Sequence, residues 1–366
     1  RPRNVANLVE EIHTLHEKYP EMEGVFFDEE VHNIKKTFNI SLAKAIRSAG
    51  LDHLKYEAMC EYASLDEEAL EEMRAAGYYK IRFGIETGSD KVAQKMTLGK
   101  KHDLDKLRRM VKFGKSLGML FYGTISIGGL GSDQEEDKKT VDLVYEMASQ
   151  GWLDEIQVSI NTPQPGTDFY NSCQEESLIA PSTDWEGFDG NGQVVVQYPH
   201  YPAEAIQENF KKALSAFDMG KEKAQSQIFS NNAKSSFNLI AEGSRVLLLR
   251  SVRNWMIRLI LENLSTKTDV DLLGQNVSTK DLEGLEGLTQ IYSYGTGFFS
   301  TESISTELID KLKNHQYDYI LVPVANNNLD GFENVLNVAK MLGSEDILYV
   351  YPEGRLQPTS DSPVSI

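Results

Sequence analysis

The strongest constraint on the fold is an alternation between residues 21 and 160, where short apolar or β-branched runs alternate with amphipathic helical segments. The runs expected to form strands are 24–28, 53–60, 79–86, 120–127 and 155–160, and the segments expected to form helices are 34–49, 66–76, 104–117 and 135–150. Gly50, Gly77, Gly118 and Gly151 follow these helices, where a left-handed residue commonly ends a helix. The alternation predicts successive βα units around a parallel sheet, as a full or partial barrel or an open doubly wound sheet.

Composition excludes several classes of function. The 366 residues include 37 Lys and Arg against 55 Asp and Glu, which gives a net charge of −18. This excess of negative charge argues against a nucleic-acid-binding or anionic-lipid-binding surface. No apolar run approaches the ~20 residues that span a bilayer. The two cysteines do not make a disulfide framework, which indicates a reducing compartment, and we expect a cytoplasmic protein.

A second domain is predicted after a change of sequence character at residue 160. Residues 163–200 are rich in Pro, Gly, Ser and Asp, and an amphipathic helix is expected from 203 to about 223. The polar stretch 225–238 is the predicted linker, which places a first domain at 1–224 and a second at 239–366. A second βα series follows, with strands expected at 245–249, 270–273, 290–294, 319–324 and 347–350 and helices at 252–264, 303–314 and 331–342. This series predicts a smaller Rossmann-like α/β domain, whose first strand is not followed by the Gly-x-Gly-x-x-Gly of dinucleotide-binding folds.

Three loops at predicted strand ends carry candidate chemistry, because ligands of parallel sheets bind at the carboxyl ends of the strands. Asp28 and Glu29 follow the first strand, where carboxylates accept a ligand ammonium group or a cation; a solvated acidic turn is the alternative. Glu86 ends the third strand, where its carboxylate is suited to accept the two hydroxyls of a ribose. Thr87, Gly88 and Ser89 follow Glu86, and Ser89 is also a good N-cap.

The third loop follows the fourth strand. Ile127, Gly128 and Gly129 begin a Gly-rich turn that lets a flat ring lie against the strand, although a plain strand-to-helix turn explains the glycines equally well. Cys60 and Cys173 are isolated and have no neighbouring Cys or His at metal-ligand spacing. The sequence therefore predicts no metal site from its own residues.

The order of these loops resembles the radical S-adenosylmethionine (SAM) superfamily, in the branch whose members often carry a cobalamin-binding domain upstream. The resemblance covers residues 1 to about 220. The matching segments are Arg1-Pro2-Arg3-Asn4-Val5 with Leu8, Val9, Glu11 and Ile12, then Phe27-Asp28-Glu29, residues 65–77, Phe83-Gly84-Ile85-Glu86-Thr87-Gly88-Ser89, Ile127-Gly128-Gly129-Leu130-Gly131, and residues 163–170.

The resemblance implies a function and a set of cofactors. Asp28 and Glu29 would lie near the amino group of SAM and Glu86 near its ribose, while Thr87, Gly88 and Ser89 would shape the same loop and Ile127, Gly128 and Gly129 would lie beside the adenine. In the family, a 4Fe–4S cluster held by three cysteinates cleaves SAM reductively to a 5′-deoxyadenosyl radical. The expected reaction is a methylation, methylthiolation or rearrangement of a substrate that the sequence does not identify, with a flavodoxin or ferredoxin as electron donor. The use of cobalamin stays open, because a domain that binds it would precede Arg1.

Two departures from the family pattern qualify these expectations. The Cys-x-x-x-Cys-x-x-Cys loop is absent, and Cys60 and Cys173 do not take its place; we therefore expect a fragment that is inactive alone, with the cluster ligands upstream. Leu130-Gly131-Ser132 stands where the family usually has Pro-Gly-Glu, so that Asp133 is the candidate substitute for a helix-start carboxylate. Two other functions remain open: a barrel without a cluster that acts as a binding or scaffold protein, and a lyase or hydrolase that uses Glu86 as a base.

Overall fold

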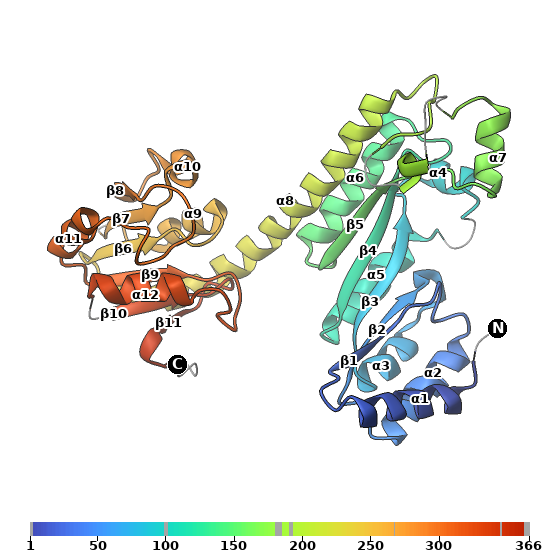
Figure 1. Ribbon diagram of the computed structural model, residues 1–366, viewed down its shortest axis with the longest axis horizontal. Helices are drawn as coiled ribbons and strands as arrows, with labels where there is room; N and C mark the ends of the chain where they lie inside the picture. Colours follow the sequence, from blue (N-terminus) through green and yellow to red (C-terminus); the bar gives the residue numbers. More distant parts are fainter. Residues whose placement is uncertain are drawn as a thin grey trace. The chain divides into compact units, whose positions relative to one another are not determined.

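The computed structural model describes residues 3–98, 102–179, 185–189, 193–266, 268–344 and 346–361. The chain divides into two compact units, Arg1–Lys221 and Glu222–Ile366. Each unit has its own sheet, and each is described by itself below (Figure 1).

The N-terminal unit contains a five-stranded sheet whose strands follow one another in sequence order, β1-β2-β3-β4-β5, with every neighbouring pair parallel. The strands are β1 (Gly24–Phe27), β2 (Lys55–Cys60), β3 (Tyr78–Glu86), β4 (Leu120–Ile127) and β5 (Glu155–Ile160). The helices are α1 (Val5–Lys18), α2 (Lys36–Ser48), α3 (Glu67–Ala75), α4 (Asp90–Lys95), α5 (Leu104–Ser116), α6 (Gln134–Ser149) and α7 (Asp168–Glu175), with short 3-10 turns at Tyr62–Ser64 and Trp185–Asp189. This succession of parallel βα units confirms the predicted partial βα barrel.

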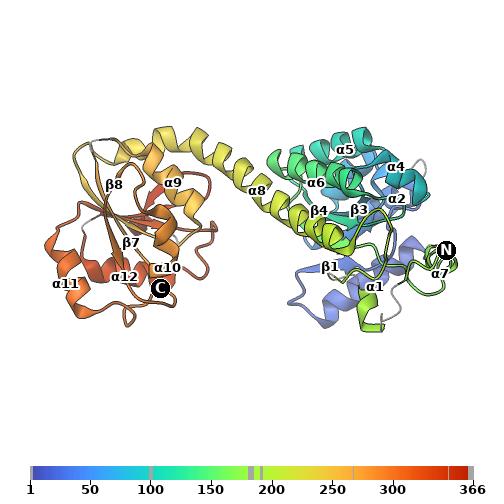
Figure 2. The ribbon, with the colours of Figure 1, turned by 90° about the horizontal axis from the view of Figure 1, so that it is seen from above.

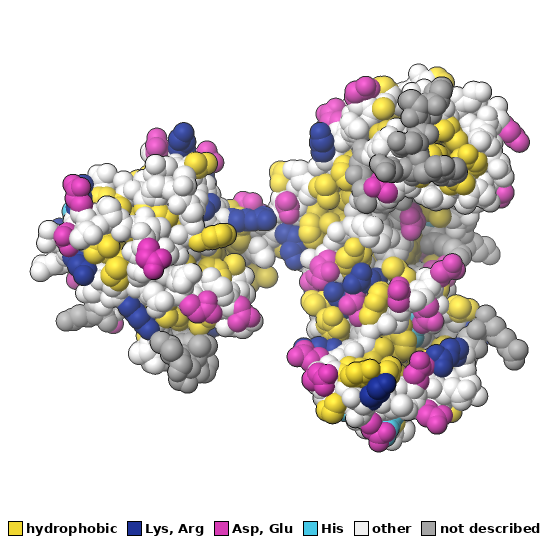
Figure 3. Space-filling view, in the orientation of Figure 1, with side chains coloured by type: hydrophobic (Ala, Val, Ile, Leu, Met, Phe, Trp, Pro, Cys, Tyr) yellow, Lys and Arg dark blue, Asp and Glu magenta, His cyan; other side chains and the backbone are white. Residues whose placement is uncertain are grey.

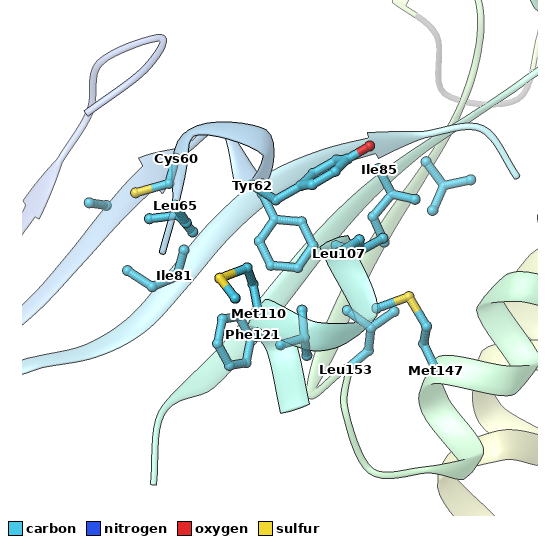
Figure 4. Packing of buried hydrophobic residues seen from close by; sticks show 14 of the residues in the cluster. Cys60, Tyr62, Leu65, Ile81, Ile85, Leu107, Met110, Phe121, Met147 and Leu153 are labelled. Atoms are coloured by element: carbon cyan, nitrogen blue, oxygen red, sulfur yellow. The ribbon is translucent and has the colours of Figure 1, made fainter. Parts of the chain in front are cut away.

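The core of this unit lies on the helix-covered face of the sheet, because residues of a strand alternate between its two faces. Ile81, Phe83 and Ile85 of β3 are at most 1% exposed and belong to the same cluster as Leu107 and Met110 of α5. Figure 2 shows α4, α5 and α6 on one side of β3 and β4. Figure 4 shows part of this cluster, in which Met110 lies beside Phe121 of β4.

The C-terminal unit has a six-stranded sheet in the order β11-β10-β9-β6-β7-β8, parallel except for β11. Its strands are β6 (Arg245–Leu249), β7 (Asp269–Gly274), β8 (Leu288–Ser293), β9 (Tyr319–Pro323), β10 (Asp346–Val350) and β11 (Leu356–Pro358), and its helices are α9 (Asn254–Asn263), α10 (Asn276–Thr279), α11 (Thr306–Asn314) and α12 (Glu333–Leu342), with 3-10 turns at Phe237–Leu239, Lys280–Leu282 and Thr359–Asp361. One apolar cluster joins the sheet to α9, and a second joins its other face to α11 and α12. The predicted Rossmann-like layer is confirmed, with β11 and α10 as additions that the sequence did not indicate.

Helix α8 (Ala203–Ser236) is longer than the sequence predicts, because residues 225–236, expected to form a linker, continue the helix. No Gly or Pro occurs from 221 to 242, so nothing in the chain stops the helix there. Phe229, Ala233 and Phe237 follow at intervals of four residues and belong to the core of the C-terminal unit. The burial of this apolar stripe explains why a stretch rich in Ser and Asn is ordered as a helix.

The surface carries the excess of negative charge in a dispersed form. Figure 3 shows Asp and Glu side chains spread over the visible face of each unit. Among the described residues, none of the helices is both long and apolar enough to cross a membrane.

We expect Leu107→Ala to lower the free energy of unfolding of the N-terminal unit by about 2–5 kcal/mol, because Leu107 is fully buried and truncation leaves a cavity. Urea unfolding in a Trp255→Phe background measures this, since the remaining tryptophans, Trp152 and Trp185, lie in the N-terminal unit. Leu15→Ala, at a position 38% exposed on α1, is the control and should change stability far less. Equal losses for the two variants would contradict the assignment of Leu107 to the core.

Candidate functional site

A cavity of about 640 Å³ lies at the carboxyl ends of β1 to β4, the position where parallel βα folds bind ligands. Its lining gathers residues from five segments of the chain: Asp28, Glu29, Glu30, Val31, Met59, Cys60, Glu61, Tyr62, Gly84, Ile85, Glu86, Leu98 and Thr124. The structure therefore brings together Asp28, Glu29 and Glu86, which the sequence places in two separate loops.

His32 holds the acidic loop that follows β1, which contains Asp28 and Glu29. The sequence pattern does not mark this histidine. His32 is 2% exposed; its Nδ1 contacts the Glu29 carboxylate, and its Nε2 lies 2.8 Å from the Tyr78 hydroxyl. Its backbone N–H donates to the Met59 carbonyl at 2.7 Å. A buried imidazole with a partner at each nitrogen orients the loop and directs its carboxylates to the cavity.

The next residue ties the same loop to the end of β2. The Asn33 side chain accepts a hydrogen bond from the Glu61 N–H at 2.7 Å and donates to the Glu61 carbonyl at 2.8 Å. Because Glu61 itself lines the cavity, Asn33 sets the spacing between two of its walls. Asn is common in turns after a strand, so no specific signal in the sequence marks Asn33, and a single His such as His32 is no signal by itself.

Glu86 projects into the cavity from a strained turn. It has a φ of 64°, in the left-handed region that non-glycine residues rarely adopt, and the β3–β4 register shifts between Gly84 and Glu86. A Cβ added at Gly84 would collide with Oε1 of Glu86, so a side chain at this position would displace the Glu86 carboxylate. The Ser126 hydroxyl of β4 donates to Oε2 at 3.3 Å. The bulge turns the carboxylate toward the cavity and leaves Oε1 with no protein donor among the described residues.

The electrostatic state of Glu86 follows from its burial. Desolvation raises the pKa of its carboxyl above the ordinary value of 4.5, and the hydrogen bond from Ser126 offsets part of that rise. A ligand that donates hydroxyl hydrogens to this carboxylate would replace the lost water.

Thr87 and Ser89 lie away from the cavity, because both are fully buried and bonded within the protein. The Thr87 hydroxyl lies 3.1 Å from that of Thr140 on α6, which also accepts from the Gly88 N–H at 2.9 Å. Ser89 caps α4 by accepting from the Val92 N–H at 3.2 Å, and its hydroxyl contacts Glu136. These residues hold the loop after Glu86 against α6, and their direct contact with a ligand stays a prediction.

Ile127 ends β4, Gly128 and Gly129 follow it, and none of the three lines the cavity. Ile127 is fully buried, and the Gly128 N–H donates to the buried carboxylate of Asp137 at 2.8 Å. A Cβ at Gly129 would lie 2.8 Å from the Met96 sulfur, so the turn packs closely on its neighbours. Their predicted place beside an adenine stays a prediction.

Asp137 is a second buried carboxylate that sequence analysis missed, since it lies within a helix pattern. Besides Gly128, it accepts from the Ser132 hydroxyl at 2.9 Å and the Tyr201 hydroxyl at 2.9 Å. Burial raises the pKa of Asp137, which these hydrogen bonds counteract. Asp133, the candidate substitute carboxylate, instead caps α6 through the N–H groups of Glu135 and Glu136.

Below Glu86, the same face of the sheet carries an ion cluster rather than apolar side chains. Glu57 of β2 pairs with Arg82 and, at 3.4 Å, with Lys80, both of β3. Lys80 also pairs with Glu155 of β5 at 3.1 Å. The Arg82 guanidinium stacks 4.5 Å from the Tyr122 ring centroid. Because these charges pair with one another, the carboxylates that line the cavity come from other residues, namely Asp28, Glu29, Glu30, Glu61 and Glu86.

The two cysteines of this chain do not supply the three thiolates that the implied iron–sulfur cluster requires. Cys60 lines the cavity and Cys173 lies on α7, both buried, and burial raises the pKa of each thiol. Among the described residues, no group of three His, Cys, Asp or Glu is placed to hold a metal ion.

The raised pKa of Glu86 predicts a pH-dependent stability. The folded state binds more protons than the unfolded state between pH 4.5 and the raised pKa, so wild-type stability falls as pH rises through this window. Glu86→Gln removes the titrating carboxyl. The free energy of unfolding of Glu86→Gln minus that of the wild type should therefore increase as the pH rises through this window. Urea unfolding at a series of pH values measures the difference.

Ser126→Ala is the matched variant for this experiment, because it removes the bond that lowers the pKa. It should extend the pH range over which stability declines. Parallel pH profiles for wild type and Glu86→Gln would show that the carboxylate is not desolvated.

No protein-family model matches the chain. It is 26% identical over 218 residues to an uncharacterized methyltransferase of Pyrococcus horikoshii, an alignment that covers 59% of this chain and 45% of that protein. It is 24% identical over 183 residues to a cytidylyl-2-hydroxyethylphosphonate methyltransferase of Streptomyces wedmorensis, which covers 50% of this chain and 34% of that protein. The chain thus spans less than half the length of these two curated relatives.

Two solved structures are also similar. The radical SAM methyltransferase TsrM of Kitasatospora setae, with tryptophan and a SAM analogue bound, aligns with a TM-score of 0.45 at 15% identity, over 60% of this chain and 46% of that chain. The radical SAM enzyme coproporphyrinogen III oxidase of Escherichia coli aligns with a TM-score of 0.36 at 13% identity, over 50% of this chain and 38% of that chain. Both of these solved structures are described as radical SAM enzymes, the superfamily that the sequence of residues 1 to about 220 resembles.

Proposed function

We propose that the N-terminal unit binds SAM in the cavity at the ends of β1 to β4 and that the full-length protein is a radical SAM enzyme that methylates its substrate. The single observation that carries the proposal is the convergence of Asp28, Glu29 and Glu86 on one cavity. The two curated relatives, both named as methyltransferases, support methylation over methylthiolation or rearrangement.

The donor set fits SAM. The Asp28 and Glu29 carboxylates are suited to accept the ammonium hydrogens of its methionyl part, since acceptor-only groups favour a cation. Glu86, with one oxygen bonded to Ser126, is suited to accept ribose hydroxyls. His32 and Asn33 hold the acidic loop in place, and the bulge at Glu86 aims its carboxylate. Bound SAM would supply the methyl group or the radical, and this chain would position it and exclude water.

A 4Fe–4S cluster enters the proposal only through the resemblance, because Cys60 and Cys173 do not form the required cysteine trio. Cluster ligands from elsewhere in the full-length protein, an electron donor of the flavodoxin or ferredoxin type and a cytoplasmic location are further parts of the proposal.

Glu86→Ala in the full-length protein should weaken SAM binding by about tenfold or more, because hydrogen bonds to a charged group are worth ~1.5–3 kcal/mol. Anaerobic calorimetry measures the affinity, while iron content and the electron paramagnetic resonance signal should stay unchanged. Glu30→Ala is the matched control, as Glu30 lines the same cavity but is not assigned to SAM.

Three results would contradict parts of the proposal. Unchanged SAM affinity and unchanged 5′-deoxyadenosine formation in Glu86→Ala would show that the ribose assignment is wrong. SAM binding without any turnover would favour a binding or scaffold protein. Activity in air without a reductant, with a pH profile that follows one carboxylate, would favour a lyase or hydrolase with Glu86 as base.

A further inference from the structure

The C-terminal unit has its own topological position for a ligand. Strand order reverses at β6, with β7 and β8 on one side and β9 and β10 on the other. The Ser251 hydroxyl, after β6, donates to the Pro323 carbonyl at the end of β9 at 2.6 Å, so the two strand ends are joined at this edge. In open α/β sheets, ligands bind beyond the carboxyl ends of the strands where the order reverses.

Basic side chains lie in the loops at this edge, close to the ends of the strands. The first residues after β6, β7, β8 and β9, at 250–256, 275–280, 294–301 and 324–329, include Arg250, Arg253 and Lys280, and the acidic residues Asp281, Glu302 and Asp330 follow directly after the last three of these segments. The chain as a whole has 55 acidic against 37 basic residues. The turn after β10 does carry Glu353, which pairs with Arg355 at 3.2 Å. Among these loops, the one after β6 carries positive charge, at Arg250 and Arg253, without an Asp or Glu before α9.

Arg250 is the central cation of this edge. Its side chain packs over Gly274, where an added Cβ would lie 3.0 Å from the Cβ of Arg250. Its Nε donates to the Asn254 side chain at 3.0 Å, and no ion pair joins it to a carboxylate of the described residues. Burial lowers the pKa of the guanidinium, which remains charged. A half-buried guanidinium without a carboxylate is stabilised by binding an anion.

Asn326, in the segment after β9, adds an unused acceptor. Its Nδ2 donates to the Asp330 carbonyl at 3.0 Å, whereas its Oδ1 is buried without a hydrogen-bond partner in the described part of the chain. Leaving a buried acceptor unpaired is costly, and a ligand hydroxyl would satisfy it. After β8, Phe298 is 92% exposed, and such a ring is able to stack on a nucleobase.

We propose that the carboxyl edge of the C-terminal sheet binds a phosphorylated ligand, with Arg250 and Arg253 on its phosphate oxygens and Asn326 on a hydroxyl. Guanidinium groups match the geometry of phosphate oxygens. In dinucleotide-binding folds, the backbone N–H groups of a Gly-rich loop contact the phosphates, and here the two guanidinium groups would take that role. This proposal is independent of SAM binding by the N-terminal unit.

Calorimetric titration of the 366-residue chain tests the site with two probes, inorganic pyrophosphate and uridine diphosphate. Both should bind, and Arg250→Gln/Arg253→Gln should weaken both by about tenfold or more. Arg245→Gln is the control, because it removes a positive charge at the opposite end of β6, where Arg245 donates to the His315 carbonyl at 2.7 Å. Asn326→Ala should weaken uridine diphosphate more than pyrophosphate, since only the former carries hydroxyls.

Absence of binding of both probes by the wild type would overturn the proposal, as would an equal loss in Arg245→Gln. Should circular dichroism show that the double variant is unfolded, Arg253→Glu replaces it, because Arg253 is exposed and its substitution leaves the core intact. Tighter binding of uridine diphosphate than of pyrophosphate would identify a nucleotide ligand, and equal binding would identify the phosphate group alone as the determinant.

Discussion

Strand β3 occupies the centre of the N-terminal sheet, and the chemistry of that unit follows from the contrast between its two faces. Ile81, Phe83 and Ile85 bury one face against the helices, while Lys80, Arg82 and Glu86 lie on the other. The apolar face fixes the register of the strand, since a slip by one residue would place these charges in the core. Glu86 thereby reaches the cavity from a rigid element, with the backbone strain of its left-handed conformation sustained by the packed strand beneath it.

The two units distribute charge in opposite ways at equivalent places in their sheets. At the carboxyl edge of the N-terminal sheet, Asp28, Glu29 and Glu86 face one cavity, an arrangement suited to ligand ammonium and hydroxyl groups. At the carboxyl edge of the C-terminal sheet, Arg250 and Arg253 lie in a loop after β6 that contains no Asp or Glu, which suits an anionic ligand. In a chain of net charge −18, neither arrangement follows from average composition. In each unit, the charged residues lie at the carboxyl ends of the strands, where parallel sheets bind ligands.

Much of the fold and part of the candidate site were predictable from the sequence, with instructive exceptions. The strands and helices around Gly50, Gly77, Gly118 and Gly151 were located because a local periodicity and a left-handed terminator specify them. Helix α8 was predicted too short, because the burial of Phe229, Ala233 and Phe237 is a tertiary effect that outweighs the weak helix propensity of Ser and Asn. Thr87 and Ser89 follow Glu86 in the same loop, but their side chains form bonds to α6 and cap α4.

The sequence by itself determined the parallel βα architecture of both units and the positions of the acidic loop and Glu86 at strand ends, because these depend on local patterns and on the fixed direction of parallel strands. Only the tertiary structure decided which polar groups reach the cavity and which support it. The roles of His32, Asn33 and Asp137 depend on hydrogen bonds with residues that are distant in the sequence. These partners are Tyr78, Glu61 and Tyr201, respectively. The physical reason is that desolvation and hydrogen-bond partners, which decide the role of a polar side chain, come from segments brought together by the packed core.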